Sequence, residues 1–170
     1  MDDTFADLFA GNERYAAVPH EVAATGVARR GLAILTCIDS RIDPLAVFGL
    51  EPGDAKILRN AGARVTDDAL RSLALAVAAL GVTRIAVVQH TGCRMTESTD
   101  AELRGAVADA TGRAVDDLVP LAIDDPAASL EADVAAILAS PWVPDGVIVG
   151  GLVYDLQSGR LTTVVEPRRA

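Results

Sequence analysis

The chain has 170 residues, of which 51% are hydrophobic and only 4% aromatic, and it carries a formal net charge of −9. This length suits a single domain over residues 1–170 with its own hydrophobic core. Such an acidic chain would repel nucleic acid and anionic membranes, and because it has neither a basic leader nor an apolar run near the roughly 18 residues of a membrane span, we expect a cytoplasmic protein.

The first predicted element is an amphipathic helix over residues 4–17, followed by a loop. A short apolar run at 32–36 predicts a strand buried on both faces, and a helical turn is expected at 42–48. Residues 55–59 form a second predicted strand, which leads into a loop that contains Gly62. The helix at 4–17 has no obvious partner, so it could cover its own sheet or reach across to a second subunit.

A longer helix is expected next, with Thr66 as its N-cap and Gly81 at its end. Its predicted apolar face runs through Leu70, Leu73, Leu75 and Val77. A third apolar strand at 84–89 leads directly into His90.

The C-terminal part is predicted to contain two helices and a hairpin. Thr99 and Glu102 have the spacing of a capping box, which starts a helix reaching about residue 110, and Asp125 starts another that ends before Pro141. A strand at 147–153 and a return strand at 161–165 flank a turn. Strands that alternate with helices predict an α/β fold: a mainly parallel central sheet flanked by helices, with a C-terminal antiparallel hairpin.

Both cysteines and one of the two histidines follow predicted strands. In open parallel sheets functional groups gather beyond the carboxyl ends of the strands, so Cys37, His90 and Cys93 could meet if their strands are neighbours. Two thiolates and one imidazole form a ligand set that suits zinc. The alternative is that the cysteines are small core residues and that His90 is a hydrogen-bonded residue at a strand end.

Asp39 and Arg41 lie directly after Cys37, two residues apart, so their side chains can pair within one turn. Alone, such a pair would be a surface ion pair of little energetic consequence. Beside a metal, a carboxylate held by arginine could accept a hydrogen bond from a metal-bound hydroxide or coordinate the metal itself.

Three segments resemble, in order and spacing, the three motifs of the β-carbonic anhydrases, and in particular the compact microbial branch of that family. They are Cys37-Ile38-Asp39-Ser40-Arg41, Arg59-Asn60-Ala61-Gly62 and His90-Thr91-Gly92-Cys93. The resemblance implies one Zn²⁺ per subunit, held by Cys37, His90 and Cys93, with Asp39 and Arg41 as the catalytic pair. It also implies a carbonate dehydratase, which reversibly hydrates carbon dioxide to bicarbonate by means of a zinc-bound hydroxide.

The same resemblance implies a homodimer or a higher even oligomer, with the helix at 4–17 packed at the interface or exchanged between subunits. Gly62 could bring a backbone amide close to the substrate, although a need for a positive φ angle would explain this glycine equally well. His20 is interpreted as an exposed loop residue, not as a proton shuttle.

Three other functions compete with this prediction. Carbonyl sulfide or carbon disulfide hydrolysis would use the same ligands, because the shape of the pocket decides between linear substrates and the motifs do not. A non-catalytic zinc-binding protein would keep the metal alone. A redox or phosphatase role for Cys37 is disfavoured, since the chain has neither the Cys-x5-Arg loop of phosphatases nor a Cys-x-x-Cys pair.

Overall fold

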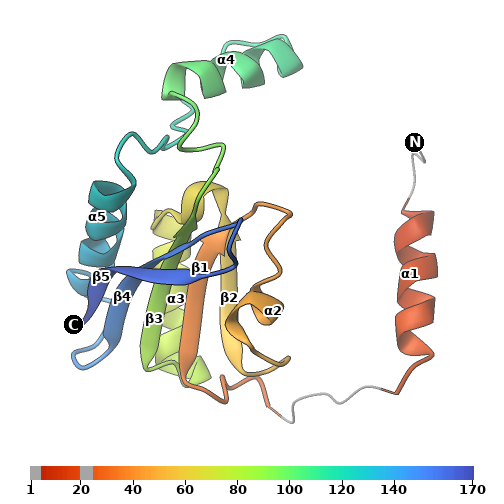
Figure 1. The fold of residues 1–170 in the computed structure, drawn as a ribbon, viewed down its shortest axis with the longest axis vertical. Coiled ribbons are helices and arrows are strands. Elements are labelled where there is room, and N and C mark those ends of the chain that lie inside the picture. Colours follow the sequence, from red (N-terminus) through yellow and green to blue (C-terminus); the bar gives the residue numbers. More distant parts are fainter. Residues whose placement is uncertain (1–4, 20–24) are drawn as a thin grey trace.

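The computed structural model describes residues 5–19 and 25–170, so His20 lies outside the described residues. The helices are α1 (Ala6–Ala16), α2 (Pro44–Phe48), α3 (Asp67–Leu80), α4 (Asp100–Thr111) and α5 (Pro126–Leu138), with a 3-10 turn, η1, at Ala61–Ala63 (Figure 1). The strands are β1 (Leu32–Cys37), β2 (Ala55–Asn60), β3 (Arg84–His90), β4 (Ile148–Tyr154) and β5 (Leu161–Arg169).

The strands form one sheet in the order β2-β1-β3-β4-β5. Strand β1 pairs in parallel with β2 and β3, β3 pairs in parallel with β4, and β5 runs antiparallel to β4. The predicted α/β class, with its mainly parallel sheet and C-terminal antiparallel hairpin, is confirmed. This order makes β1 and β3 direct neighbours, which is the condition that the proposed ligand set requires.

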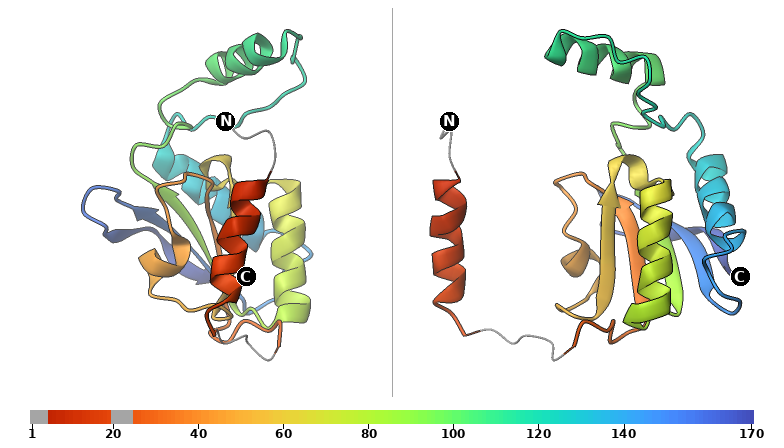
Figure 2. Two further views of the ribbon diagram at one scale, coloured as in Figure 1. Left: turned by 90° about the vertical axis from the view of Figure 1, so that its right-hand side faces the viewer. Right: turned by 180° about the vertical axis from the view of Figure 1, so that it is seen from behind.

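Helices α3 and α5 lie on one face of the sheet and the short helix α2 lies on the other (Figure 2). Because successive residues of a strand point to opposite faces, Ala33 and Leu35 of β1 pack towards α3 and α5, whereas Ile34 packs with Leu50 on the α2 side. Leu73 of α3 has no exposed surface. Burial of such a leucine stabilises the fold by about 1.5–3 kcal/mol.

The predicted helix starts are confirmed at three places. The Thr66 side chain accepts a hydrogen bond from the Ala69 amide, and Asp125 caps α5 in the same manner. Thr99 and Glu102 form the complete capping box that their spacing predicts.

The predicted apolar face of α3 was wrong at Leu75, which is 53% exposed. Residues two apart on a helix lie about 200° apart around its axis, so Leu73 and Leu75 cannot face the same core. The small residues Ala69 and Ala76 are buried beside Leu73 instead. Their size lets the helix approach the sheet closely.

Strand β5 is longer than predicted, since it continues from Leu161 to Arg169 and includes Pro167. A proline lacks the amide hydrogen of a ladder and is tolerated only at sheet edges and bulges. Both conditions hold, because β5 is an edge strand and its register with β4 shifts between Val149 and Gly151.

Helix α1 stands apart from the rest of the protein in Figure 1 and in the right view of Figure 2. Its predicted span of 4–17 begins at a residue outside the described ones, and the helix itself runs from Ala6 to Ala16 with no buried residue. The alternative that it covers its own sheet is therefore not what the structure shows. Its apolar residues Phe5, Leu8 and Phe9 are 72%, 62% and 69% exposed.

Within the described residues, none of the helices has the length and hydrophobicity that crossing a membrane requires.

Candidate metal centre

The three predicted ligands lie together at the carboxyl ends of two neighbouring strands. Cys37 is the last residue of β1 and His90 the last residue of β3, and Cys93 follows in the loop after β3. Parallel pairing of β1 with β3 places both strand ends at the same edge of the sheet. The sheet order thus brings together residues that are more than fifty positions apart in sequence.

The ligand atoms of Cys37, His90 and Cys93 all lie within 4.8 Å of one another, and all three residues are buried. The two sulfur atoms are 3.8 Å apart. Such a cluster has the size and the chemistry of a Cys2His site for a soft divalent ion such as zinc.

The imidazole of His90 is oriented for metal binding. Its Nδ1 lies 2.9 Å from the backbone carbonyl oxygen of Thr91. Because a carbonyl oxygen can only accept, this contact assigns the tautomer in which Nδ1 carries the hydrogen and donates it. Its Nε2 is buried and lacks a hydrogen-bond partner among the described residues. Because a buried polar atom without a partner is costly, this nitrogen fits the position of a metal ligand.

The two thiols differ in acidity. The Cys93 side chain, through its hydrogen bond to the Cys37 sulfur, lowers the pKa of Cys37, while the same contact raises the pKa of Cys93. The contact between the two sulfur atoms therefore favours the ionised form of Cys37 and the protonated form of Cys93. A thiolate next to an imidazole is the protonation state from which a metal site forms, because metals bind the deprotonated sulfur.

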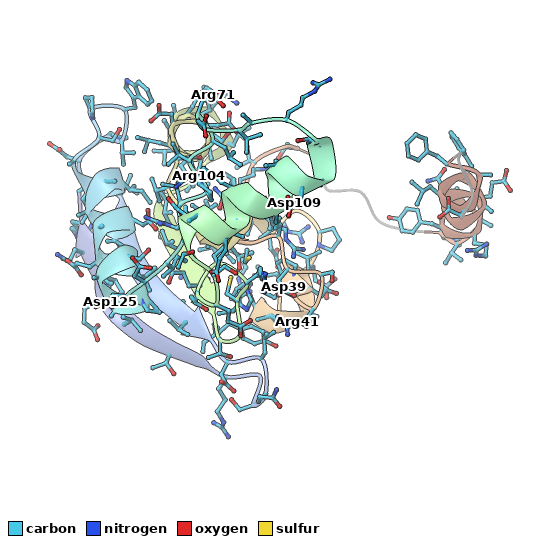
Figure 3. All side chains as sticks on the ribbon, turned by 90° about the horizontal axis from the view of Figure 1, so that it is seen from above. Asp39, Arg41, Arg71, Arg104, Asp109 and Asp125 are labelled. Atoms are coloured by element: carbon cyan, nitrogen blue, oxygen red, sulfur yellow. The ribbon has the colours of Figure 1, made fainter. Side chains whose placement is uncertain are left out.

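Asp39 and Arg41 pair beside this cluster, as predicted, and Figure 3 shows them close together. Asp39 Oδ1 accepts hydrogen bonds from the Arg41 amide and Nε, each at 2.9 Å, and Oδ2 accepts one from Nη2 at 2.6 Å. These contacts hold the pKa of Asp39 well below its usual range. Asp39 Oδ2 also lies 3.8 Å from His90 Nε2, so the carboxylate reaches the edge of the ligand cluster.

Gly62 lies in η1 with a φ angle of 76°, a conformation that favours glycine. Its amide nitrogen is 3.4 Å from the Cys37 sulfur, to which it donates a hydrogen bond. The positive φ angle expected for this residue is therefore present, and the amide contacts a proposed ligand. A contact with substrate stays a prediction.

Comparison with known proteins decides the family. The family model described as carbonic anhydrase matches residues 32–124, more than half of the chain. β-Carbonic anhydrase 1 of Mycobacterium tuberculosis is 35% identical over 136 residues, which cover 78% of this chain and 81% of that protein. The chain belongs to the β-carbonic anhydrase family.

Two further similarities bear on the fold and on substrate choice. The carbonic anhydrase structure from Streptococcus mutans aligns with a TM-score of 0.88 and 34% identity over 96% of this chain and 99% of that one. A carbon disulfide hydrolase of Acidithiobacillus thiooxidans is 31% identical over 155 residues, covering 78% of this chain and 71% of that protein. The β-carbonic anhydrase relatives therefore include proteins named for a different linear substrate.

Among the motif residues to which the sequence-based prediction gave no role, one supports the backbone of the site. Arg59, at the end of β2, donates from Nε to the Cys37 carbonyl oxygen at 2.9 Å and from Nη2 to the Asp39 carbonyl oxygen at 2.7 Å. It thereby fixes the backbone that carries both side chains. Its place within a β-carbonic anhydrase motif indicated that Arg59 has a role. Its contacts could not be predicted, because only the sheet order shows that β2 borders β1.

Proposed function

We propose that the chain is a zinc-dependent carbonic anhydrase that reversibly hydrates carbon dioxide to bicarbonate. Cys37, His90 and Cys93 would hold one Zn²⁺ per subunit, and Asp39 with Arg41 would be the catalytic pair. The observation that carries the proposal is the buried Nε2 of His90. This atom has no hydrogen-bond partner in the part of the chain that the structure describes, and it lies in one cluster with two sulfur atoms and 3.8 Å from Asp39 Oδ2.

When bound, zinc supplies a Lewis acid that lowers the pKa of water towards neutrality and so provides a nucleophile near pH 7. The two cysteines would bind as thiolates and neutralise the formal charge of Zn²⁺. Acidification of water by the metal would then be weaker, and Asp39 with Arg41 would contribute more to it. Asp39 is ionised and can only accept hydrogen bonds, so it would orient a water molecule through one of its hydrogens. Arg41 keeps this acceptor in place by occupying both carboxylate oxygens.

Stopped-flow carbon dioxide hydration by protein of measured zinc content tests this proposal, with scans from about pH 6.5 to 9 across the expected titration of metal-bound water. We expect hydration by the wild type and a loss of about 100-fold or more in Asp39→Asn with zinc retained. The matched control is Asp68→Asn, which removes a carboxylate from another Asp–Arg pair on the exposed surface of α3. It should leave hydration unchanged.

A second candidate function is hydrolysis of carbon disulfide or carbonyl sulfide, because a carbon disulfide hydrolase is among the similar proteins. Parallel assays with all three substrates on one zinc-loaded preparation separate the two functions. Hydration of carbon dioxide alone would support the first proposal, and turnover of the sulfur compounds alone would support the second. Stoichiometric zinc without turnover of any substrate would indicate a non-catalytic zinc protein.

We also propose that the active form is a homodimer, or a higher even oligomer, in which α1 of one subunit packs on a second subunit. The exposed Phe5, Leu8 and Phe9 on a helix that stands apart from its own sheet support this. A hollow of about 490 Å³ on the α2 side of the sheet adds further apolar surface, formed in part by Ile34, Phe48 and Leu152.

Analytical ultracentrifugation of the full chain tests the assembly. The wild type should sediment as a dimer or larger, and Phe5→Glu combined with Phe9→Glu should sediment as a smaller species. Asn12→Ala, a polar position of the same helix, serves as control. A monomeric wild type would refute the proposed assembly. The cytoplasmic location stays a prediction.

A further inference from the structure

Thr91 connects the His90 end of β3 to the hairpin formed by β4 and β5. His90 and Tyr154 form the last pair in the register of β3 and β4. Directly beyond this pair the Thr91 amide donates to the Tyr154 carbonyl oxygen at 3.0 Å. The Thr91 hydroxyl donates to Asp155 Oδ2 at 3.2 Å and accepts from the Leu156 amide at 3.1 Å. Three hydrogen bonds therefore fix one residue to the start of the hairpin.

Asp155 is itself held firmly. Its Oδ1 accepts hydrogen bonds from the amide and the hydroxyl of Ser158, both at 2.7 Å. Its amide donates to the Arg160 carbonyl oxygen, and its carbonyl oxygen accepts from the Gly159 amide. One oxygen of the Asp155 carboxylate thus closes the hairpin turn, while the other reaches back to Thr91. The Asp155 carboxylate therefore links the hairpin turn directly to Thr91, the residue that follows β3.

This connection ends at the proposed metal ligand. The carbonyl oxygen of Thr91 accepts the hydrogen bond from His90 Nδ1 at 2.9 Å. A partner of this kind fixes both the tautomer and the ring orientation of a ligating histidine, and here it leaves Nε2 directed to the sulfur atoms. Any displacement of Thr91 would move the acceptor and allow the ring to turn.

We propose that Thr91 and Asp155 are positioning residues, which hold the His90 imidazole ready for the metal through the Thr91 carbonyl. The inference rests on the metal site of the proposed function and adds two residues that are not among the ligands of the cluster. It assigns to the C-terminal hairpin a role in metal retention, although the hairpin contributes no ligand.

The test compares Thr91→Val, which keeps the shape of the side chain but lacks the hydroxyl, with Thr91→Ser, which keeps the hydroxyl. Asp155→Asn tests the other end of the contact, and Thr163→Val on the exposed side of β5 is the control. Three quantities are measured on the full chain: the rate of zinc loss to a chelator, the absorption spectrum of the Co²⁺-substituted protein, and the thermal stability without metal.

Thr91→Val should lose zinc to the chelator about tenfold faster or more and shift the Co²⁺ spectrum, whereas Thr91→Ser and Thr163→Val should behave as the wild type. Asp155→Asn should accelerate zinc loss in the same direction, and it carries the test if Thr91→Val does not fold. Unchanged zinc loss and an unchanged Co²⁺ spectrum would overturn the inference, even if metal-free stability falls, because the contact would then only brace the hairpin. A wild type that binds no zinc would overturn the proposed function itself.

Discussion

The guanidinium of Arg41 holds both oxygens of the Asp39 carboxylate, with Nε 2.9 Å from Oδ1 and Nη2 2.6 Å from Oδ2. The same Nη2 donates to the Gly92 carbonyl oxygen at 2.8 Å, in the loop between His90 and Cys93. The pair therefore bridges the loop that follows Cys37 and the loop between His90 and Cys93. A planar fork is needed for these contacts, and a lysine cannot supply it.

We predict that Arg41→Lys lowers kcat/KM for carbon dioxide hydration by about tenfold to a hundredfold while zinc content is maintained, since misplacement of a positioned group by about 1 Å has an effect of this size. Stopped-flow assays with metal analysis of the same sample measure both quantities. Undiminished kcat/KM would mean that the positive charge alone is sufficient.

The lowered pKa of Asp39 predicts a dependence of stability on pH. Arg41 stabilises the ionised carboxylate in the folded chain, so the contribution is complete above the unfolded aspartate pKa of about 3.9 and is lost as the pH falls towards the folded value. In urea unfolding of metal-free protein, the advantage of the wild type over Asp39→Asn should be constant from about pH 7 to 5 and shrink below about pH 4. A difference that stays constant down to about pH 2 would contradict this.

The partly buried ion pair between Arg64 and Asp133 connects the segment after η1 to α5. Arg64 Nε lies 2.7 Å from Asp133 Oδ2, and Oδ1 accepts the Val65 amide at 3.0 Å. Asp133→Ala should lower the free energy of unfolding by about 2–4 kcal/mol, because it leaves the partly buried arginine with only the Leu121 carbonyl oxygen as a partner among the described residues and the Val65 amide without its acceptor. Urea unfolding measures this. Asp68→Ala, which breaks the exposed pair with Arg71, should cost at most about 1 kcal/mol.

Gly62 should not tolerate a side chain. A β-carbon there would lie 3.1 Å from Ile123 Cδ1 and 3.2 Å from Met95 Cγ, at a φ angle of +76°. Gly62→Ala should reduce the free energy of unfolding by about 1–3 kcal/mol and weaken zinc binding, since its amide contacts the Cys37 sulfur. Ala63→Gly is the control: Ala63 also has a positive φ angle, and its replacement should change stability by no more than about 1 kcal/mol. Equal stabilities of the two variants would argue against backbone strain.

The sequence predicted those parts of the fold that depend on local chemistry. Thr66, Thr99 and Asp125 start helices because their side chains satisfy amides of the first turn, and this requires no knowledge of distant residues. The meeting of Cys37 with His90 was predictable for a different reason. Parallel strands end at one edge, so only the adjacency of β1 and β3 had to be assumed.

Features that depend on tertiary geometry could not be predicted from the sequence. The carbonyl contacts of Arg59 require the adjacency of β2 and β1, and the link between Thr91 and Asp155 joins residues 64 positions apart. The outward position of Leu75 follows from which turn of α3 meets the sheet, and a hydrophobic residue alone does not reveal this. The amphipathic pattern of α1 likewise does not reveal that the helix lies apart from its own sheet (Figure 1).

The pairing of β1 with β3 places Thr36 opposite Val88, and the ligands leave the sheet directly beyond this pair. A slip of one residue would turn the Cys37 side chain to the other face of the sheet, and a slip of two would displace it by roughly 7 Å. Either slip would move the Cys37 sulfur out of the cluster in which the ligand atoms lie within 4.8 Å of one another. A metal ion would therefore bind only chains whose strands have paired correctly, and by mass action would draw the folding population towards them. Metal binding would in this way select the correct register of β1 and β3.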